Sequence, residues 1–222
     1  NEAAFMGLCA IFDGKDSGDD YRSFIRALED AAIHDPHRVA EAFPLFLRSD
    51  YTSAKHEWSK SCFVTDIPAI DTAVRSIAYF SMCVGCPLPI GSKWAIRELL
   101  PIMPVTWCPN FAGMPVNREF RFFADEHGAR AYQPYWPEQA LLDGGAPNRP
   151  RWPLLWEMSP EELVELRDLA EKAAKAAGPG EWSVDLLETE RGWFVTDMAA
   201  ADSSYRGDQI RVLSSTHERQ RP

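Results

Sequence analysis

The stretch Arg118-Glu119-Phe120-Arg121-Phe122-Phe123-Ala124 alternates charged and apolar side chains near the middle of the chain. Because successive side chains of a β-strand point to opposite faces of a sheet, the alternation predicts a half-buried strand. Residues 125–128 contain the Asp and Gly that favour a turn, and residues 129–135 then return as a second strand. The centre of the chain is therefore expected to form two neighbouring strands.

On the C-terminal side, a helix and a hairpin follow these strands. Ser159-Pro160-Glu161-Glu162 has the pattern of a helix start, with a capping Ser, Pro at the first helical position and Glu at the third. Gly178 suits the end of that helix. Residues 182–188 and 193–197 then predict the arms of a hairpin that turns around Glu190-Arg191-Gly192.

Apolar periodicity and turn residues predict the remaining elements. The Pro- and Gly-rich residues 136–153 favour a loop that could serve as a lid. In chain order, the other expected elements are a helix at 19–33, a short helix from Pro36 through Val39 and Ala42, strands at 44–48 and 61–65, a helix capped by Asp66 and a strand at 94–102.

This order of elements predicts an α+β protein with two lobes. Helices with a small sheet come first, and an antiparallel sheet with a long helix follows. We expect an N-terminal lobe at residues 1–95 and a C-terminal lobe at residues 96–222. The sequence contains neither GxGxxG nor GxxxxGK followed by Ser or Thr, so neither a Rossmann nor a P-loop nucleotide site is indicated.

The composition excludes two classes of partner. The 222 residues carry a formal net charge of −10, whereas sequence-independent binding of nucleic acid needs a basic surface. No apolar run approaches the roughly 20 residues that span a bilayer, and no charged-then-apolar leader opens the chain. We therefore expect a cytoplasmic protein, in which a local basic pocket for phosphate remains compatible with the net charge.

The cysteines indicate reduced thiols. Cys9, Cys62, Cys83, Cys86 and Cys108 form an odd, scattered set in a chain large enough to fold without disulfides. Cys83 and Cys86 form a CxxC, but no second pair or His cluster with zinc spacing follows. This favours a packing role over a metal site.

The first candidate site is a polar segment after a predicted strand. Arg48 ends that strand, and Lys55 closes the polar turn that follows. Arg48 could donate two parallel hydrogen bonds to phosphate oxygens, Lys55 could add a point charge, and Ser53 could offer a backbone N–H to an anion. The alternative is an ordinary solvated loop with surface cations.

The second candidate is the apolar strand that joins the lobes. A strand at 94–101 can present backbone N–H and C=O groups to a flat base in an apolar slot. A buried core strand would have the same composition, so both interpretations stay open.

Charged residues in the central strand and the final hairpin complete the set. Glu119 and Arg121 should share one side of their strand, where they could bridge metal and phosphate or form a surface ion pair. Asp185 and Asp197 lie on opposite arms of the hairpin, so their carboxylates can meet and hold Mg²⁺. Asp is uncommon in strands, although exposed strand positions would also accommodate it.

Taken in this order, the four segments resemble the ATP-grasp superfamily over about residues 43–205. The resemblance implies that ATP lies between two lobes and that Arg48, Ser53 and Lys55 bind its phosphates. It also implies an adenine hinge at Glu98, Leu99 and Leu100, and a phosphate and substrate side lined by Arg118, Glu119 and Arg121. Asp185 and Asp197 match the acids that bind Mg²⁺ in the family.

Two features depart from the family pattern. The last metal-binding acid is usually followed two residues later by Asn, and that position is Ala199 here. The residues before Arg48 are also too few for the separate N-terminal domain of many family ligases.

The resemblance implies a ligase that joins a carboxylate to an amine or a similar nucleophile through an acyl phosphate, with release of ADP. The substrates would be small molecules or a protein terminus or side chain. The alternative is a non-ligase of the same fold, either a phosphotransferase or a factor that binds ATP and assists assembly of a partner. The two departures, Ala199 and the missing substrate domain, favour this alternative.

Overall fold

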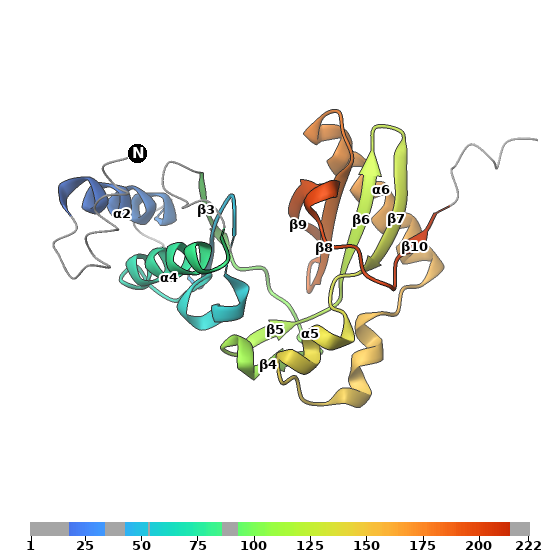
Figure 1. Ribbon diagram of the computed structural model, residues 1–222, viewed down its shortest axis with the longest axis horizontal. Helices are drawn as coiled ribbons and strands as arrows, with labels where there is room; N and C mark the ends of the chain where they lie inside the picture. The colour runs from blue at the N-terminus through green and yellow to red at the C-terminus, as the bar shows by residue number, and fades with distance from the viewer. Residues whose placement is uncertain (1–17, 34–42, 53, 86–92, 214–222) are drawn as a thin grey trace, which may run out of the picture. The chain divides into compact units, whose positions relative to one another are not determined.

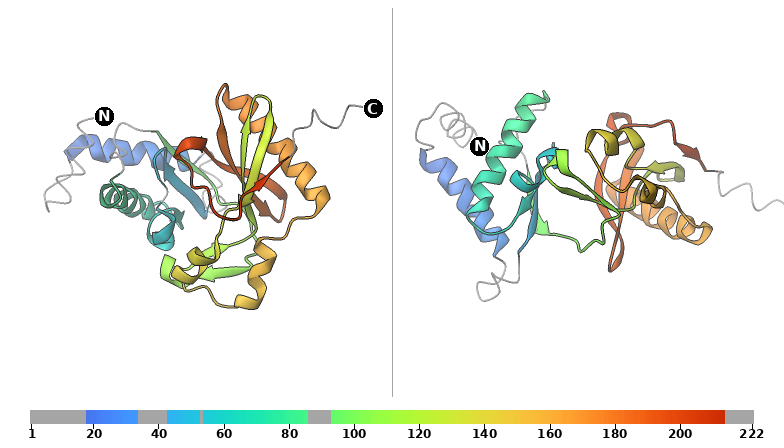
Figure 2. Two further views of the ribbon diagram at one scale, coloured as in Figure 1. Left: turned by 45° about the vertical axis from the view of Figure 1, so that its right-hand side comes forward. Right: turned by 90° about the horizontal axis from the view of Figure 1, so that it is seen from below.

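The computed structural model describes residues 18–33, 43–52, 54–85 and 93–213, and the chain divides into two compact units. The N-terminal unit comprises Asn1–Leu100 and Pro109–Met114, and the C-terminal unit comprises Pro101–Cys108 and Pro115–Pro222. In each unit, helices pack against antiparallel strands (Figure 1; Figure 2). The expected α+β class is therefore confirmed.

The N-terminal unit is a three-stranded sheet covered by two helices. Strand β1 (Leu45–Ser49) pairs on one side with β2 (Phe63–Val64) and on the other with β3 (Trp94–Glu98). Helices α2 (Gly18–Ala32) and α4 (Ala69–Cys83) supply most of the core. The core includes Tyr21, Leu28, Leu47, Ile70 and Ile77.

The sequence-based prediction for this unit holds for its main elements and fails at one boundary. The strand expected at 94–102 ends at Glu98. Pro101 has no N–H for a sheet ladder, and proline also restricts the residue before it, so the strand stops early. Residues 55–60 of the expected polar stretch form a 3₁₀ helix, Lys55–Lys60. The short helix expected from Pro36 through Val39 and Ala42 lies outside the described residues.

The C-terminal unit is built on a five-stranded antiparallel sheet. Its strand order is β10-β7-β6-β8-β9, and helix α6 (Pro160–Ala177) lies along one face (Figure 1). The strands are β6 (Glu119–Asp125), β7 (Gly128–Pro134), β8 (Trp182–Thr189), β9 (Gly192–Ala200) and β10 (Arg211–Val212). Strands β4 (Thr106–Cys108) and β5 (Met114–Val116) form a separate pair, and a 3₁₀ turn occurs at Ala201–Ser203. A further 3₁₀ turn, Pro109–Phe111, belongs to the N-terminal unit.

The face of this sheet beneath α6 is apolar. Phe120 and Phe122 of β6 and Val184 and Leu186 of β8 are fully buried there with Leu166, Ala170 and Ala174 of the helix. Since side chains alternate along each strand, Arg121 and Asp185 must point to the opposite face. The hydrophobic core therefore fixes which residues lie on the face away from α6.

Two predictions for this unit were wrong. Strand β6 is buried along most of its length, including Glu119 at 4% exposure, so it is not half-buried. Residues 136–153 are not a simple loop, because α5 (Glu138–Asp143) and a 3₁₀ helix (Arg149–Leu155) form within and beyond them. The fully buried Leu141 anchors α5, whose residues favour helix despite the surrounding prolines.

The cysteines differ in burial. Cys62 and Cys108 are buried, and burial raises the pKa of both thiols to about 11. Cys83 is exposed at the end of α4, so the packing role expected for it was wrong, and Cys86 lies outside the described residues. None of the helices in the described ranges is long and apolar enough to cross a membrane.

The predicted capping box of α6 is present and gives a stability prediction. The Glu162 N–H donates to Ser159 Oγ over 3.1 Å, and the Ser159 N–H donates to Glu162 Oε2 over 2.8 Å. Ser159→Ala should lower the free energy of unfolding by about 1 kcal/mol in urea denaturation, because one N–H loses its acceptor. Ser159→Asp retains a capping oxygen and should stay close to the wild type. Equal stability of the Ala variant and the wild type would contradict this role.

Candidate functional site

A row of polar side chains crosses the C-terminal sheet on the face away from α6. Arg121 of β6 is the register partner of Gln133 on β7 and of Asp185 on β8, and Asp185 is in turn the partner of Asp197 on β9. Directly opposed residues of antiparallel strands point to the same face. Residues far apart in sequence thus form one line, Gln133–Arg121–Asp185–Asp197, which we call the polar row.

The strongest contact in the polar row is a two-pronged ion pair. Arg121 donates from Nε to Asp185 Oδ1 over 2.7 Å and from Nη2 to Asp185 Oδ2 over 2.9 Å. The two side chains are only 14% and 3% exposed. The Arg121 guanidinium also lies 4.9 Å from the centre of the Tyr135 ring. Burial alone would lower the pKa of Arg121, but hydrogen bonding and attraction to Asp185 outweigh it, so the pKa is raised.

The edge strand is irregular where it passes Asp185. Asp185 opposes Asp197, but Leu186 opposes Val195, so Thr196 is an extra residue in β9. Thr196 Oγ1 donates to the Asp185 carbonyl oxygen over 3.3 Å and to Glu119 Oε1 over 3.4 Å. Bulges of this kind re-aim side chains and are common beside active sites. Here the bulge ties Glu119 to the same region as Asp185.

The carboxylates of the polar row have the chemistry of a magnesium site. Asp185 and Asp197 carry carboxylates on adjacent strands, and Mg²⁺ commonly takes one or two carboxylates and completes its shell with water and phosphate. Within the described ranges, no group of three or more His, Cys, Asp or Glu side chains could hold a metal. A metal at this position would therefore depend on phosphate or water for its other ligands.

Arg118 lies apart from the polar row. Its guanidinium donates to Glu162 from both terminal nitrogens, over 2.8 and 2.9 Å, and to Glu188 over 3.0 Å. It also donates to the Glu157 carbonyl oxygen over 2.8 Å. The ring of Trp193, which packs against the core under α6, lies 5.3 Å away. Arg118 therefore joins the start of α6 to the end of β8, and it does not share a face with Arg121.

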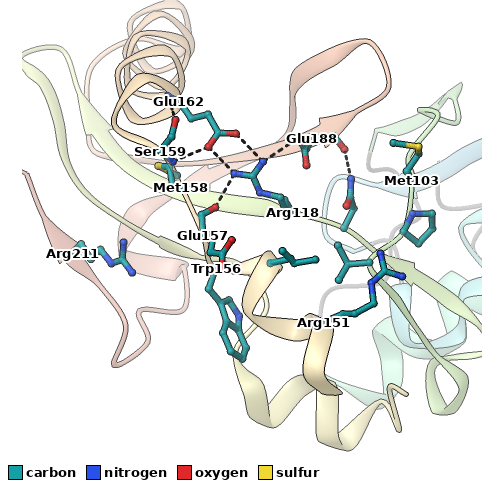
Figure 3. Close-up of a pocket in the computed structure, with 14 residues that line it drawn as sticks. Met103, Arg118, Arg151, Trp156, Glu157, Met158, Ser159, Glu162, Glu188 and Arg211 are labelled. Atoms are coloured by element: carbon teal, nitrogen blue, oxygen red, sulfur yellow. Dashed lines mark hydrogen bonds and ion pairs between the residues drawn. The ribbon is translucent and has the colours of Figure 1, made fainter. Parts of the chain in front are cut away.

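These contacts lie in a pocket of about 840 Å³ within the C-terminal unit. Figure 3 shows Arg118 between Glu162 and Glu188, with Arg151 and Trp156 nearby. Both carboxylates and a carbonyl oxygen already occupy the terminal nitrogens of Arg118. The geometry therefore favours a structural role for Arg118 in this pocket over binding of phosphate.

The predicted phosphate-binding residues belong to the N-terminal unit. Arg48 is on β1, and its Nε donates to the Ser49 carbonyl oxygen over 3.0 Å. Lys55 begins the 3₁₀ helix after Ala54, which has the left-handed φ of 52°. The Thr52 N–H donates to Ser49 Oγ over 3.0 Å, so the turn uses this N–H internally. Ser53 lies outside the described residues.

The predicted adenine hinge follows β3. Glu98 is the last residue of that strand and opposes Leu45, whereas Leu99 and Leu100 continue beyond it. The Leu99 N–H donates to the Pro44 carbonyl oxygen over 3.4 Å. This N–H is therefore engaged within its own unit.

Sequence analysis identified both acids of the polar row and Arg121 but missed three neighbours. Gln133, Tyr135 and Thr196 enter through strand register and the bulge, which no local sequence pattern encodes. The alternation of β6 does place Arg121 on a defined face. Knowing that β6 pairs with β8 would have been enough to predict that Arg121 lies opposite Asp185.

Comparisons with known proteins yield structural similarity only. The chain matches no model of a known family and no curated protein. It resembles a RimK domain ATP-grasp protein from Sphaerobacter thermophilus at 15% identity, with a TM-score of 0.39, over 78% of this chain and 48% of the other. It also resembles the biotin carboxylase domain of a 2-oxoglutarate carboxylase from Hydrogenobacter thermophilus, solved with MgADP, ADP and bicarbonate.

The second similarity has 11% identity and a TM-score of 0.42, over 78% of this chain and 33% of the other. The chain therefore spans about half the length of the first protein and a third of the second. The expected structural similarity to ATP-grasp proteins is confirmed, at low sequence identity.

Proposed function

We propose that the protein binds ATP with Mg²⁺ as an ATP-grasp protein does, and that the polar row of the C-terminal sheet binds the metal and the phosphates. The observation that carries this proposal is the register of Arg121, Asp185 and Asp197 across three adjacent strands. Hydrophobic packing under α6 keeps these three residues on the opposite face of the sheet, which supports the proposal.

Each member of the row has a role that suits its chemistry. Asp185 and Asp197 would hold Mg²⁺, which neutralises negative charge on a polyphosphate when it is bound. Arg121 presents a planar fork, which matches phosphate oxygens as well as it matches the carboxylate it now contacts. Glu119, two residues before Arg121, lies close enough to Thr196 to orient the edge strand.

The reaction we propose is ADP-forming ligation of a carboxylate to an amine or similar nucleophile. A carboxylate oxygen of the first substrate attacks the γ-phosphorus of ATP, and the bond to the β-γ bridging oxygen breaks with release of ADP. The nucleophile then attacks the acyl carbon, loses a proton and displaces inorganic phosphate. Arg121 would stabilise the charge that develops on the transferred group.

A second candidate function is nucleotide binding with little turnover, as in a factor that assists assembly of a partner. Two observations favour it. Both oxygens of Asp185 already accept hydrogen bonds from Arg121, and Ala199 supplies no ligand at the position where a third is expected. The two functions differ in whether ADP forms when an acid and a nucleophile are supplied together.

Removal of the Asp197 carboxylate tests the metal site. Asp197→Asn should lose the extra ATP affinity that Mg²⁺ confers, roughly tenfold or about 1.4 kcal/mol, because one of two metal-binding carboxylates is gone. Calorimetric titration with ATP, in Mg²⁺ and in EDTA, measures this increment.

The matched control is Asp168→Asn, which removes a carboxylate from an exposed pair with Lys172 on α6. Asp168→Asn should retain the full increase in ATP affinity that Mg²⁺ confers. If Mg²⁺ raises the ATP affinity of Asp197→Asn as much as it raises that of the wild type, Asp197 is not a metal ligand.

A further inference from the structure

Asp185 is a poor ligand for a metal ion while it is paired with Arg121. Each of its oxygens accepts a hydrogen bond from Arg121, and the carboxylate is almost completely buried. A divalent cation bound to the same carboxylate would lie beside the guanidinium charge in a region with little water. Like charges at such distances repel strongly when solvent does not screen them.

An anion with two suitably spaced oxygens can replace Asp185 as the acceptor for Arg121. Its guanidinium is held by the fork to Asp185 and by the face of the Tyr135 ring. A phosphate group offers two oxygens at the spacing of a carboxylate, so the fork can be transferred from one to the other. The ring contact is cation–π in nature and does not depend on which anion the guanidinium binds.

From this competition we propose that Arg121 is a latch on the metal site: it occupies Asp185 until a phosphate group takes its place, and only then does the carboxylate bind a divalent cation. The proposal rests on the function proposed above and adds an order of events to it. Arg121 thereby acts as a positioning residue through Asp185, and the free protein has low affinity for metal alone.

The latch predicts how variants at Arg121 bind Mn²⁺ without nucleotide. The wild type should bind Mn²⁺ weakly at this position, Arg121→Gln should bind it at least tenfold more tightly, and Arg121→Lys should lie between them. Lysine keeps the charge but cannot form the fork. Asp185→Asn alone should bind Mn²⁺ no more tightly than the wild type does. The double variant of Asp185→Asn and Arg121→Gln should lack the increase in Mn²⁺ affinity expected for Arg121→Gln. Paramagnetic resonance of Mn²⁺ measures the free ion directly.

Arg130→Gln is the matched control, because Arg130 forms an exposed pair with Asp125 on the same sheet. It should bind Mn²⁺ as the wild type does. If Arg121→Gln is too unstable to titrate, its melting temperature is measured with increasing Mn²⁺. Recovery of most of the lost stability, absent from the Asp185→Asn double variant, supports the latch, because the metal then replaces the missing cation.

Two results would overturn the latch: tight binding of Mn²⁺ alone by the wild type, or equal Mn²⁺ affinity of the wild type and Arg121→Gln, with no recovery of stability. A separate titration of the wild type with ATP and Mg²⁺ distinguishes this failure from failure of the proposed function. If the wild type binds ATP but Arg121→Gln has the same Mn²⁺ affinity as the wild type, only the latch is contradicted. Tight Mn²⁺ binding by Arg121→Gln without any nucleotide binding contradicts the proposed function.

Discussion

Arg118→Ala is expected to lower the free energy of unfolding by about 1.5–3 kcal/mol, the range for hydrogen bonds to charged groups, because its ion pairs are only partly buried. Arg118 is 16% exposed and connects Glu162 at the start of α6, the Glu157 carbonyl oxygen and Glu188 at the end of β8. Its removal leaves two carboxylates close together without the cation that they share. The helix and the strand then lose the ion-paired link that Arg118 provides.

Urea denaturation of Arg118→Ala and Arg149→Ala provides the comparison. Arg149 forms an ion pair with Glu138, but both side chains are about half exposed or more, and such pairs contribute little. Arg149→Ala should therefore change stability by less than about 1 kcal/mol. Equal and small effects of the two substitutions would show that Arg118 does not tie α6 to the sheet.

The Arg118 contacts also set a pH dependence. Hydrogen bonding from Arg118 is the main cause that lowers the pKa of Glu162 from its ordinary value of 4.5. The folded state therefore binds this proton less readily than the unfolded chain. The resulting stability is complete above pH 4.5 and is lost as the pH falls through the lowered pKa. In Arg118→Ala, the loss of stability caused by protonation of Glu162 at low pH should be smaller than in the wild type.

The double substitution of Arg48 and Lys55 by Ala is expected to reduce ATP affinity by roughly 100-fold or more. Each charge-assisted contact with a phosphate contributes about 1.5–3 kcal/mol, so two of them exceed the energy of a 100-fold change. Arg48 is anchored on β1 by its bond to the Ser49 carbonyl oxygen, and Lys55 begins the next helical turn. Both cations are thus held near one turn of the N-terminal unit.

Calorimetric titration with ATP and Mg²⁺ measures this change. Lys60→Ala removes an exposed lysine paired with Glu57 in the same 3₁₀ helix, and it should bind ATP as the wild type does. Wild-type affinity in the double variant, with unchanged thermal stability, would remove Arg48 and Lys55 from the phosphate site.

Local patterns predicted the elements whose stability is local. The Ser159 to Glu162 capping box specifies the start of α6 within a few residues, and the alternation of residues 118–124 specifies β6. The hairpin is longer than expected, Trp182–Thr189 and Gly192–Ala200, but its turn lies where the sequence placed it. These features depend on neighbours in sequence, which a sequence displays directly.

Features that depend on distant partners were not predictable in the same way. The proline-rich residues after Trp136 form α5, and the burial of its Leu141 depends on tertiary packing that local residue preferences do not display. Arg118 was grouped with Glu119 and Arg121 by sequence position, yet its partners Glu162 and Glu188 are far along the chain. Of the candidate site, the identities of Arg121, Asp185 and Asp197 came from sequence, whereas their ion pair came only from strand register.

Thermal unfolding with ATP and Mg²⁺ tests the central claim most directly. A ligand that binds the folded state stabilises it by about 2.7 kcal/mol at a hundredfold excess over its dissociation constant, which for a chain of this length raises the melting temperature by roughly 5–10 °C. We predict a rise of this size that grows with ATP concentration and shrinks in Asp197→Asn. A melting temperature that ATP does not change at any concentration, with Mg²⁺ present, would contradict the claim that this protein binds the nucleotide.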